Sequence, residues 1–349
     1  MQLYNQVDRE ILRQQMAENT DPRVTLSFYQ YANIEDPKLF RDELFIAWDK
    51  LGVLGRTYVA YEGINAQISV PKENFETLQA HIYSYDFMNG IRLNVAFEDD
   101  GKSFIKLKIK VRPKIVADGL DDSTFDASDC GKHLSASEFN ALTDKEDTIL
   151  VDMRNHYETE VGRFEGAICP DVDTFRDELP VVEEMLQGNE DKNIVMYCTG
   201  GIRCEKASAY FKHKGFKNVH QLEGGIIKYA HTVEAQGLNN KFKGVNFVFD
   251  DRMSERVGHD IISECHSCGK PYDIHVNCIN DACHLLFLQC EDCQEKHNTC
   301  CSAECEEFVE LPKEEQIAFR KGKDFGAQVF KKGRESAFAQ AYGDFKVKS

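Results

Sequence analysis

The chain has 349 residues, 42% of them hydrophobic and 29% charged, so it is long enough for two or three globular domains and too apolar to be disordered. Its formal net charge of −17 argues against nucleic-acid binding, because the average electrostatic field of the protein repels phosphate groups. A local basic patch is still compatible with that net charge. The N-terminal residues lack the apolar segment of a signal peptide, and no apolar run approaches the roughly 18 residues that cross a bilayer. We therefore expect a soluble, cytoplasmic protein without a membrane partner.

The first 115 residues are expected to form an N-terminal α+β domain. After a short helix and lead-in over 1–22, the apolar residues recur at helical spacing in two segments, 37–51 and 71–83. Strand-like patterns occupy 24–29, 56–60, 64–70, 91–95 and 104–111. This βαββαβ order predicts a ferredoxin-like fold that covers roughly 22–115.

Five further segments follow along the chain. Residues 116–135 are rich in Asp, Gly and Ser and are expected to be a linker. Over 136–238 strands alternate with helices, which predicts a parallel sheet flanked by helices, an α/β domain. We expect a connector over 239–264, a cysteine-rich region over 265–305 and a polar C-terminal tail over 306–349.

Within the α/β domain, the stretch 197–205 has the sequence YCTGGIRCE and lies between a buried strand and a helix. Ligands of parallel sheets bind beyond the carboxyl ends of the strands, and backbone N–H groups at a helix N-terminus favour an anion there. A cysteine at that place should have a lowered pKa and act as a thiolate nucleophile. The sequence therefore predicts Cys198 as the catalytic nucleophile; the alternative is a buried structural cysteine.

The neighbours of Cys198 have predicted roles of their own. Arg203 either adds positive charge or locks the loop by pairing with a carboxylate. Cys204 either packs as a small buried side chain or resolves an oxidised Cys198, although the curl of the loop is expected to hold the two thiols apart. Asp152 and Arg154 end a strand at the same edge of the sheet and are expected to orient loop groups. The full set of expected loop supports is Thr199, Gly200, Gly201, Ile202, Asp152 and Arg154.

Four segments of this domain resemble the rhodanese family. They are 149–154 (ILVDMR), 162–167 (GRFEGA), 197–205 and 222–225 (LEGG). The resemblance implies a rhodanese-type parallel α/β fold in which the loop cysteine carries a persulfide or acts as the nucleophile. The loop spans six residues from Cys198 to Arg203, as in the sulfurtransferases of that family, whereas the related phosphatases have a longer loop. Phosphatase chemistry is therefore disfavoured.

A basic stripe interrupts the acidic chain near the end of the N-terminal domain. The sequence 106–114, KLKIKVRPK, has a cation at every second position. In a strand all five cations would face one way, while the apolar residues between them face the core. Such a face is either a solvated strand surface or a contact for phosphates. The cations are Lys106, Lys108, Lys110, Arg112 and Lys114.

The nine cysteines from 265 to 305 have the spacing of a metal-binding region. Two cysteines separated by two residues can turn both thiolates onto one tetrahedral ion. We expect up to two structural zinc ions, because nine cysteines allow two four-thiolate sites. The expected ligands are Cys265, Cys268, Cys290 and Cys293 for one ion, and Cys278, Cys283, Cys305 and either Cys300 or Cys301 for the other. An iron–sulfur cluster and reduced free thiols are the alternatives.

Over nearly its full length the chain is similar to the bacterial tRNA uridine hydroxylases of the TrhO (YceA) type. The resemblance rests on 62–65 (EGIN), the basic stripe, the rhodanese loop with its second cysteine, 248–252 (VFDDR) and the cysteine-rich end. It implies conversion of the wobble uridine of certain tRNAs to 5-hydroxyuridine with molecular oxygen, using the cysteine of the rhodanese loop. The partner would be the tRNA anticodon region, with its phosphates on the basic stripe.

Two other functions stay open at the level of sequence. A persulfide sulfurtransferase would hand on sulfur from Cys198 in a sulfur relay or in tRNA thiolation. A non-catalytic adaptor would bind a partner protein through its metal-binding end. No flavin, haem or nicotinamide motif is evident, so the sequence does not identify an electron donor.

Overall fold

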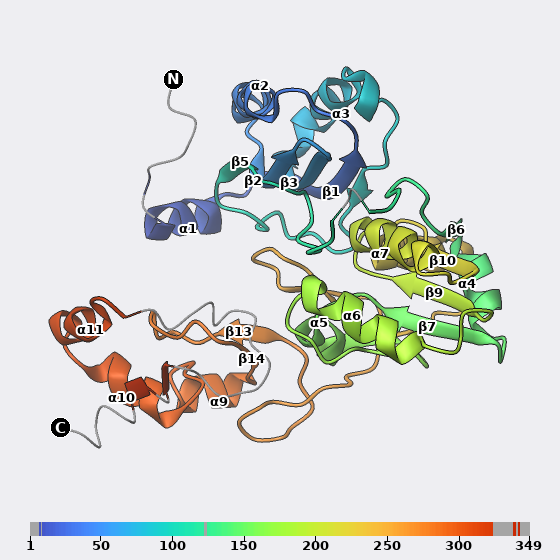
Figure 1. Ribbon diagram of the computed structural model, residues 1–349. Coiled ribbons are helices and arrows are strands. Elements are labelled where there is room, and N and C mark those ends of the chain that lie inside the picture. Colours follow the sequence, from blue (N-terminus) through green and yellow to red (C-terminus); the bar gives the residue numbers. More distant parts are fainter. Residues whose placement is uncertain (1–6, 8, 122–123, 324–337, 340, 343–349) are drawn as a thin grey trace.

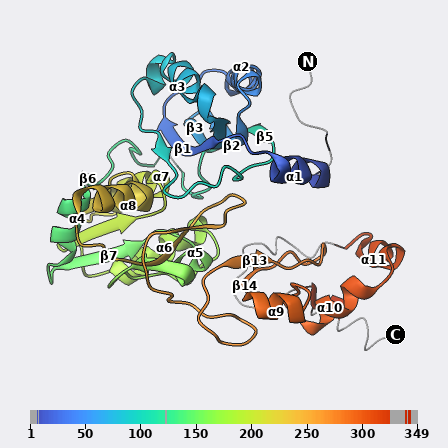
Figure 2. The same ribbon diagram turned by 180° about the vertical axis from the view of Figure 1, so that it is seen from behind.

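The structure is a computed structural model that describes residues 7, 9–121, 124–323, 338, 339, 341 and 342. Three lobes follow one another along the chain: an N-terminal domain, a central α/β domain and a cysteine-rich C-terminal lobe (Figure 1). The predicted linker and the predicted tail both extend partly beyond the described residues. The view from behind shows the same three lobes, with the C-terminal lobe furthest from the central sheet (Figure 2).

The N-terminal domain is a five-stranded sheet with helices on one face. After helix α1 (Arg9–Glu18), its strands are β1 (Arg23–Tyr31), β2 (Leu54–Ala60), β3 (Gly63–Pro71), β4 (Asn94–Val95) and β5 (Leu107–Val111). Its other helices are α2 (Pro37–Lys50) and α3 (Phe75–Tyr83). The strand order is β4-β1-β3-β2-β5, in which the first four strands follow the ferredoxin-like arrangement and β5 adds a parallel strand beside β2. The predicted ferredoxin-like fold is therefore confirmed.

The two faces of this sheet have opposite character. Side chains alternate along a strand, so Leu26 and Phe28 of β1 point into a core that also holds Leu44 and Trp48 of α2. The helices thus cover the apolar face (Figure 1). The other face carries polar and aromatic side chains, and it is turned toward the central domain, where Tyr29 of β1 reaches the start of a central helix.

The central domain has a four-stranded parallel sheet between two layers of helices. Its strands, in spatial order, are β6 (Lys132–Leu134), β10 (Asn218–Leu222), β9 (Asn193–Tyr197) and β7 (Thr148–Asp152). Helices α4 (Ala136–Thr143) and α8 (Gly225–Gln236) share one apolar cluster, and α6 (Phe175–Leu186) and α7 (Ile202–His213) share the other. The predicted parallel α/β fold is confirmed, and its first strand, β6, lies inside the segment predicted as a linker.

The predicted connector is built into the central domain by strand pairing. Within it, β11 (Phe242–Phe247) pairs with β12 (Ser254–Arg256) and also with β8 (Gly162–Phe164), which follows the short helix α5 (His156–Val161). Both pairings are antiparallel, and they give a small second sheet in the order β12-β11-β8.

Over residues 265–323 the C-terminal lobe combines a hairpin with three short helices. The hairpin is β13 (His275–Asn277) with β14 (Leu286–Leu288), and the helices are α9 (Glu291–Lys296), α10 (Ala303–Glu310) and α11 (Lys313–Arg320). Phe308, Phe338 and Tyr342 are buried against one another, although they belong to the segment predicted as a polar tail. Widely spaced aromatic residues in a polar stretch give no periodic pattern, so sequence could not show that they meet.

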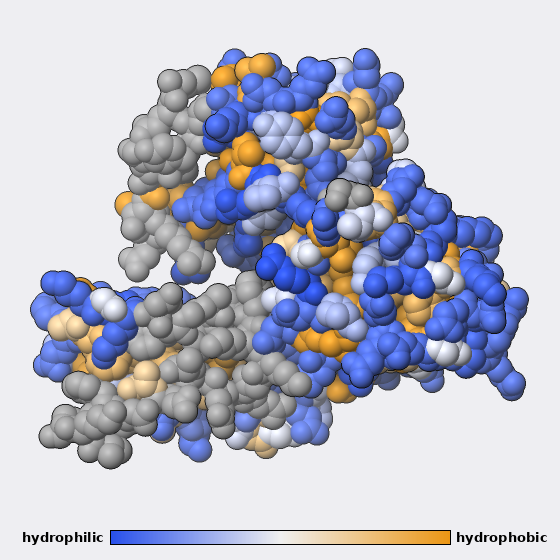
Figure 3. All heavy atoms as spheres, in the orientation of Figure 1, coloured by the Kyte–Doolittle hydropathy of each residue, from blue (hydrophilic) through white to orange (hydrophobic). Residues whose placement is uncertain are grey.

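The face of the molecule drawn in Figure 3 is largely hydrophilic, with apolar atoms in small patches. Among the described helices, none has the length and hydropathy that crossing a bilayer requires.

Candidate active site and metal-binding clusters

Cys198 is the residue after strand β9, and the loop 198–201 joins it to helix α7. The backbone N–H of Gly201 donates a hydrogen bond to the Cys198 sulfur over 3.1 Å. Gly201 has φ +106, and a Cβ there would lie 2.8 Å from the hydroxyl of Tyr29, so both conformation and space require glycine. Gly200 is different, because a Cβ there would make only ordinary contacts. Of the two glycines expected to support the loop, only Gly201 is thus required by backbone conformation.

The loop stabilises the Cys198 thiolate. The side chain is 1% exposed, and burial alone would raise the pKa of the thiol. A hydrogen bond from the Cys204 side chain, the charge of Arg203 and the backbone N–H groups of Cys204 and Gly201 outweigh burial and lower the pKa to about 6. The expectation that the loop holds Cys198 and Cys204 apart is wrong, because the first turn of α7 brings the second thiol back beneath the first.

Arg203 is locked by a carboxylate, one of its two predicted roles. Its guanidinium donates two hydrogen bonds to Glu158 of α5, over 2.6 and 2.9 Å, and the Glu158 side chain is fully buried. A paired, planar contact of this kind fixes both position and orientation. Thr199 lies beside the same pair, with its hydroxyl 3.4 Å from a Glu158 oxygen. No sequence pattern indicates Glu158, which is 45 residues away from Arg203.

Asp152 and Arg154 form a second buried ion pair, which does not reach the cysteine loop. Arg154 donates to both Asp152 oxygens over 2.8 and 2.7 Å, and also to the carbonyl of Gly162. Its guanidinium lies near the ring of Tyr197, the last residue of β9. These contacts tie β7 to the start of β8 and support the strand that carries Cys198, so the support is less direct than predicted.

The N-terminal domain completes the surroundings of the loop. The Tyr29 hydroxyl donates to Glu205 over 3.0 Å, and the Tyr31 hydroxyl lies 3.4 Å from the carbonyl of Ile202. Glu205 also meets His133 Nε2 at 2.9 Å and Gln221 Nε2 at 3.1 Å. Glu205 thus joins both domains at the N-terminal turn of α7, and sequence reasoning missed Tyr29 and His133 because they come from distant strands.

The basic stripe is exposed over most of its length and bends inward at its end. Lys106, Lys108 and Lys110 line one open pocket together with Arg56 of β2. Its empty space is about 930 Å³. Lys114 departs from the predicted row, because β5 ends at Val111 and the Lys114 ammonium pairs with the buried Asp118 over 2.7 Å. Arg112 also lies beyond the strand, with its guanidinium over the ring of Tyr58.

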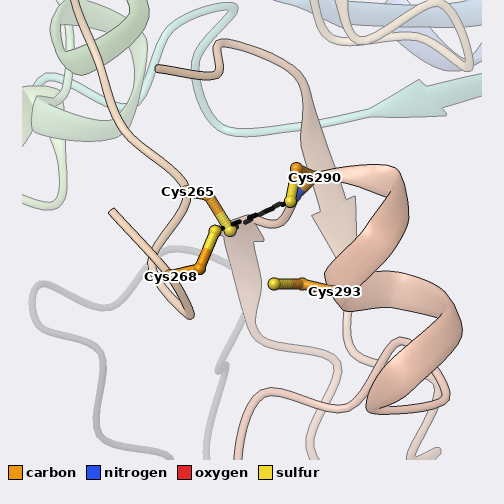
Figure 4. A group of neighbouring side chains, drawn as sticks. All are labelled: Cys265, Cys268, Cys290 and Cys293. Atoms are coloured by element: carbon orange, nitrogen blue, oxygen red, sulfur yellow. Dashed lines mark hydrogen bonds between the residues drawn. The ribbon is translucent and has the colours of Figure 1, made fainter. Parts of the chain in front are cut away.

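Two groups of four cysteines gather in the C-terminal lobe, each with all four sulfurs within 4.8 Å of one another. Figure 4 shows the first group, in which Cys265 and Cys268 from a turn face Cys290 and Cys293 at the start of α9. The sulfurs of Cys268 and Cys290 are 3.7 Å apart. A tetrahedral ion with metal–sulfur bonds of about 2.3 Å needs sulfurs about 3.8 Å apart, so this group has the size of a metal site.

The second group brings Cys301 together with three other cysteines, while the side chain of Cys300 contacts only Cys278 of that group. It consists of Cys278, Cys283, Cys301 and Cys305, so Cys300 lies outside it. The sulfur of Cys301 is 3.5 Å from that of Cys283 and 3.8 Å from that of Cys305. Both groups could therefore hold a metal ion, and the interleaved order along the chain is the one expected from the spacing.

Comparison with known proteins covers the chain in three consecutive parts. Residues 23–115 match the UPF0176 acylphosphatase-like domain, 135–232 match the rhodanese-like domain, and 243–306 match the family described as rhodanase C-terminal.

Similarity to curated proteins extends over 333 residues, 95% of the chain. The tRNA uridine(34) hydroxylase of Cronobacter sakazakii is 55% identical over 95% of its own length. The proteins of the same name from Photorhabdus laumondii and Yersinia pestis are 55% and 54% identical, the latter over 94% of its length. Such identity over almost the whole of both chains shows that this protein belongs to the tRNA uridine(34) hydroxylase family.

Proposed function

We propose that the protein hydroxylates the wobble uridine of tRNA at carbon 5, with molecular oxygen as the oxidant and Cys198 as the catalytic cysteine. The observation that carries this proposal is the Cys198 loop, which lowers the pKa of a buried thiol to about 6 and lies against the N-terminal domain. The names of the relatives supply the class of substrate.

The uracil ring explains why a thiolate would be needed. Carbon 5 of uracil reacts poorly with oxygen species, whereas addition of the Cys198 sulfur to carbon 6 turns carbon 5 into an enolate-like nucleophile. That carbon then takes a hydroxyl group from a hydroperoxide-level oxidant as the O–O bond breaks. The other oxygen of the oxidant leaves as hydroxide. Loss of the proton from carbon 5 and of the thiolate from carbon 6 restores the ring. The oxidant arises from oxygen and two electrons of an external reductant.

Arg203 acts in this scheme as a positioning residue. Its guanidinium is occupied by Glu158, so it holds the loop and adds positive charge near the thiolate without being directed at the base. Cys204 stabilises the thiolate by its hydrogen bond, and it is close enough to reduce an oxidised Cys198 by forming a disulfide.

The phosphates of the anticodon arm would occupy the pocket of Arg56, Lys106, Lys108 and Lys110. Cations at this density are the usual contacts of nucleic-acid backbones, and single-stranded loops are the parts of RNA whose bases can be splayed out and read. The acidic remainder of the chain would confine RNA to this surface.

Zinc is the metal that fits the two cysteine groups best. Four thiolates in a tetrahedron are the usual ligands of structural zinc. Such ions would fix a lobe in which the regular elements between residues 265 and 323 have at most eight residues.

A persulfide sulfurtransferase is the second candidate, favoured by the rhodanese-like match over 135–232. Mass spectrometry of tRNA nucleosides from a strain that lacks the gene distinguishes the two functions. Loss of 5-hydroxyuridine and its derivatives, restored by the wild-type gene and not by Cys198→Ser, supports hydroxylation. Loss of thiolated uridine would support sulfur transfer, and unchanged nucleosides would contradict both.

A further inference from the structure

We infer that a pocket between the N-terminal sheet and the Cys198 loop binds the flipped-out pyrimidine, and that the side-chain amides of Gln67 and Asn94 read its edge. This inference rests on the proposed function and goes beyond it by naming the base-binding site. The pocket is open to solvent, and it is lined from the N-terminal sheet by Ser27, Gln67 and Asn94 and from the central domain by Thr199, the residue after Cys198.

Strand pairing places the reading groups in one row. Asn94 of β4 is opposite Ser27 of β1, and Ser27 is opposite Gln67 of β3. Residues opposite each other in a sheet point to the same side. The polar side chains of Asn94, Ser27 and Gln67 therefore form a line on the face that is turned toward the central domain, and all three line the pocket.

The row directly borders the catalytic loop. A Cβ at Gly200 would lie 3.8 Å from Asn94 Nδ2 and 3.9 Å from Ser27 Oγ. The loop and the row are therefore close neighbours across the contact between the two domains.

The polar groups of this row are available to a ligand. Asn94 is 8% exposed, Ser27 and Gln67 are partly exposed, and in the described part of the chain these three side chains make no hydrogen bond to protein. Because the row converges on a pocket beside the Cys198 loop, its amides and hydroxyl can pair with a polar ligand there. Uracil has alternating acceptor, donor and acceptor groups on its edge, and a side-chain amide carries both a donor and an acceptor.

The same row continues into the basic pocket. Gln67 is opposite Arg56 of β2, and Arg56 is opposite Lys108 of β5. Phe104 lines both the base pocket and the basic pocket, so the two adjoin. One face of one sheet thus offers phosphate contacts at its outer edge and a base pocket at the catalytic loop. A single strand of RNA lying across the strands would meet them in that order.

The test compares Gln67→Leu and Asn94→Leu in the full chain with Gln79→Leu, a control on helix α3 of the same domain. Each pocket variant should lower kcat/KM for wobble-uridine hydroxylation by about tenfold or more, because leucine removes the pairing groups of a buried base. Binding of tRNA should change by less than about threefold, since phosphates dominate affinity. Gln79→Leu should match the wild type in both measurements, and thermal melting verifies that all variants are folded.

A crosslink provides a readout that does not depend on turnover. An anticodon stem-loop with 5-bromouridine at the wobble position should crosslink under ultraviolet light to peptides that contain β1, β3, β4 or residues 199–201. Crosslinks elsewhere, or pocket variants with wild-type kcat/KM, would overturn the pocket and leave the hydroxylase function standing. Wild-type protein that yields no 5-hydroxyuridine would instead contradict the proposed function itself.

Discussion

At the scale of single residues, the ionisation of Cys198 is the property on which the chemistry depends. Its pKa in the folded protein is about 6, below the ordinary 9.0, because the loop's hydrogen bonds and Arg203 outweigh burial. The thiolate therefore predominates above pH 6. Because the pKa of Cys198 is lower in the folded protein than in the unfolded chain, ionisation of this thiol stabilises the fold. The stabilisation is complete above pH 9 and declines as the pH falls toward 6.

A thiolate titration tests this value. The ultraviolet absorbance of the wild type minus that of Cys198→Ser should rise with a midpoint near pH 6, because only this thiol differs between the two proteins. Hydroxylation should fall below the same pH, as the thiolate becomes protonated. A difference spectrum with its midpoint near that of a free thiol, about 8.5, would contradict the role assigned to the loop.

The sequence predicts Cys198 as the nucleophile, but it does not predict the residues that surround Cys198. The strand, two glycines, Arg203 and the helix are consecutive, so their geometry follows from local rules. Glu158, Tyr29 and His133 come from other elements, and a lone polar residue in a strand or helix gives no periodic signal of what it will touch. The expected separation of the Cys198 and Cys204 thiols is wrong for a related reason, because the first turn of α7 brings the two thiols together.

At the scale of secondary-structure elements, the turn from β10 to α8 buttresses the catalytic loop. Gly225 has φ +65, and a Cβ there would lie 2.5 Å from the carbonyl oxygens of Cys198 and Thr199. Gly225→Ala should therefore displace the loop, raise the pKa of Cys198 and lower activity at least about tenfold. The same titration and a nucleoside assay measure both effects.

Gly215→Ala is the matched control for that substitution. Gly215 also has a positive φ, +96, but a Cβ there meets nothing within 4 Å. It should reduce stability by about 1 kcal/mol through backbone strain alone and leave the pKa of Cys198 unchanged. Equal effects of the two substitutions on activity would show that strain, rather than contact with the loop, is responsible.

Strand β5 is predicted to contact tRNA phosphates. Reversal of Lys106, Lys108 and Lys110 to Glu should weaken tRNA binding and reduce the slope of log affinity against log salt by about 0.7–0.9 for each lost contact. The control reverses Lys38, Lys50 and Lys72, exposed cations of the helical layer, and changes net charge equally. If both triple variants show the wild-type slope, RNA binds elsewhere.

Local pattern predicted most of the elements, and tertiary contacts account for the differences. The period-two pattern of the basic stripe correctly indicated an exposed strand face, but it could not show that Lys114 turns toward Asp118 beyond the strand end. Likewise β6 has three residues, too few for a pattern, and it exists because β10 offers it an edge for pairing.

At the scale of the whole molecule, metal ions are expected to hold the C-terminal lobe. Purified protein should contain about two zinc ions per chain, and Cys301→Ser should lower that number to about one. Cys300→Ser is the control, because Cys300 lies outside the second cysteine group. Elemental analysis measures the content. Wild-type protein without zinc, or equal loss in the two variants, would contradict the assignment, and bound iron with visible absorption would indicate an iron–sulfur cluster.

The arrangement of the domains could not be predicted from the sequence, although their number and order could. Each domain has its own pattern of strands and helices, whereas the contact between them depends on scattered pairs such as Tyr29 with Glu205 and Glu62 with Lys206. That contact places a polar sheet face on the Cys198 loop. In the proposed mechanism the site is therefore formed by both domains together.

The most direct test of the central claim is the origin of the oxygen in the modified base. Cells that lack the gene and are complemented with this chain would be grown under oxygen-18 gas, so that no electron donor has to be supplied. Nucleoside mass spectrometry should find 5-hydroxyuridine at the wobble position with one heavy oxygen, and none in cells with Cys198→Ser. Unlabelled 5-hydroxyuridine, undiminished 5-hydroxyuridine in the Cys198→Ser cells, or sulfur at that position in its place would contradict the account.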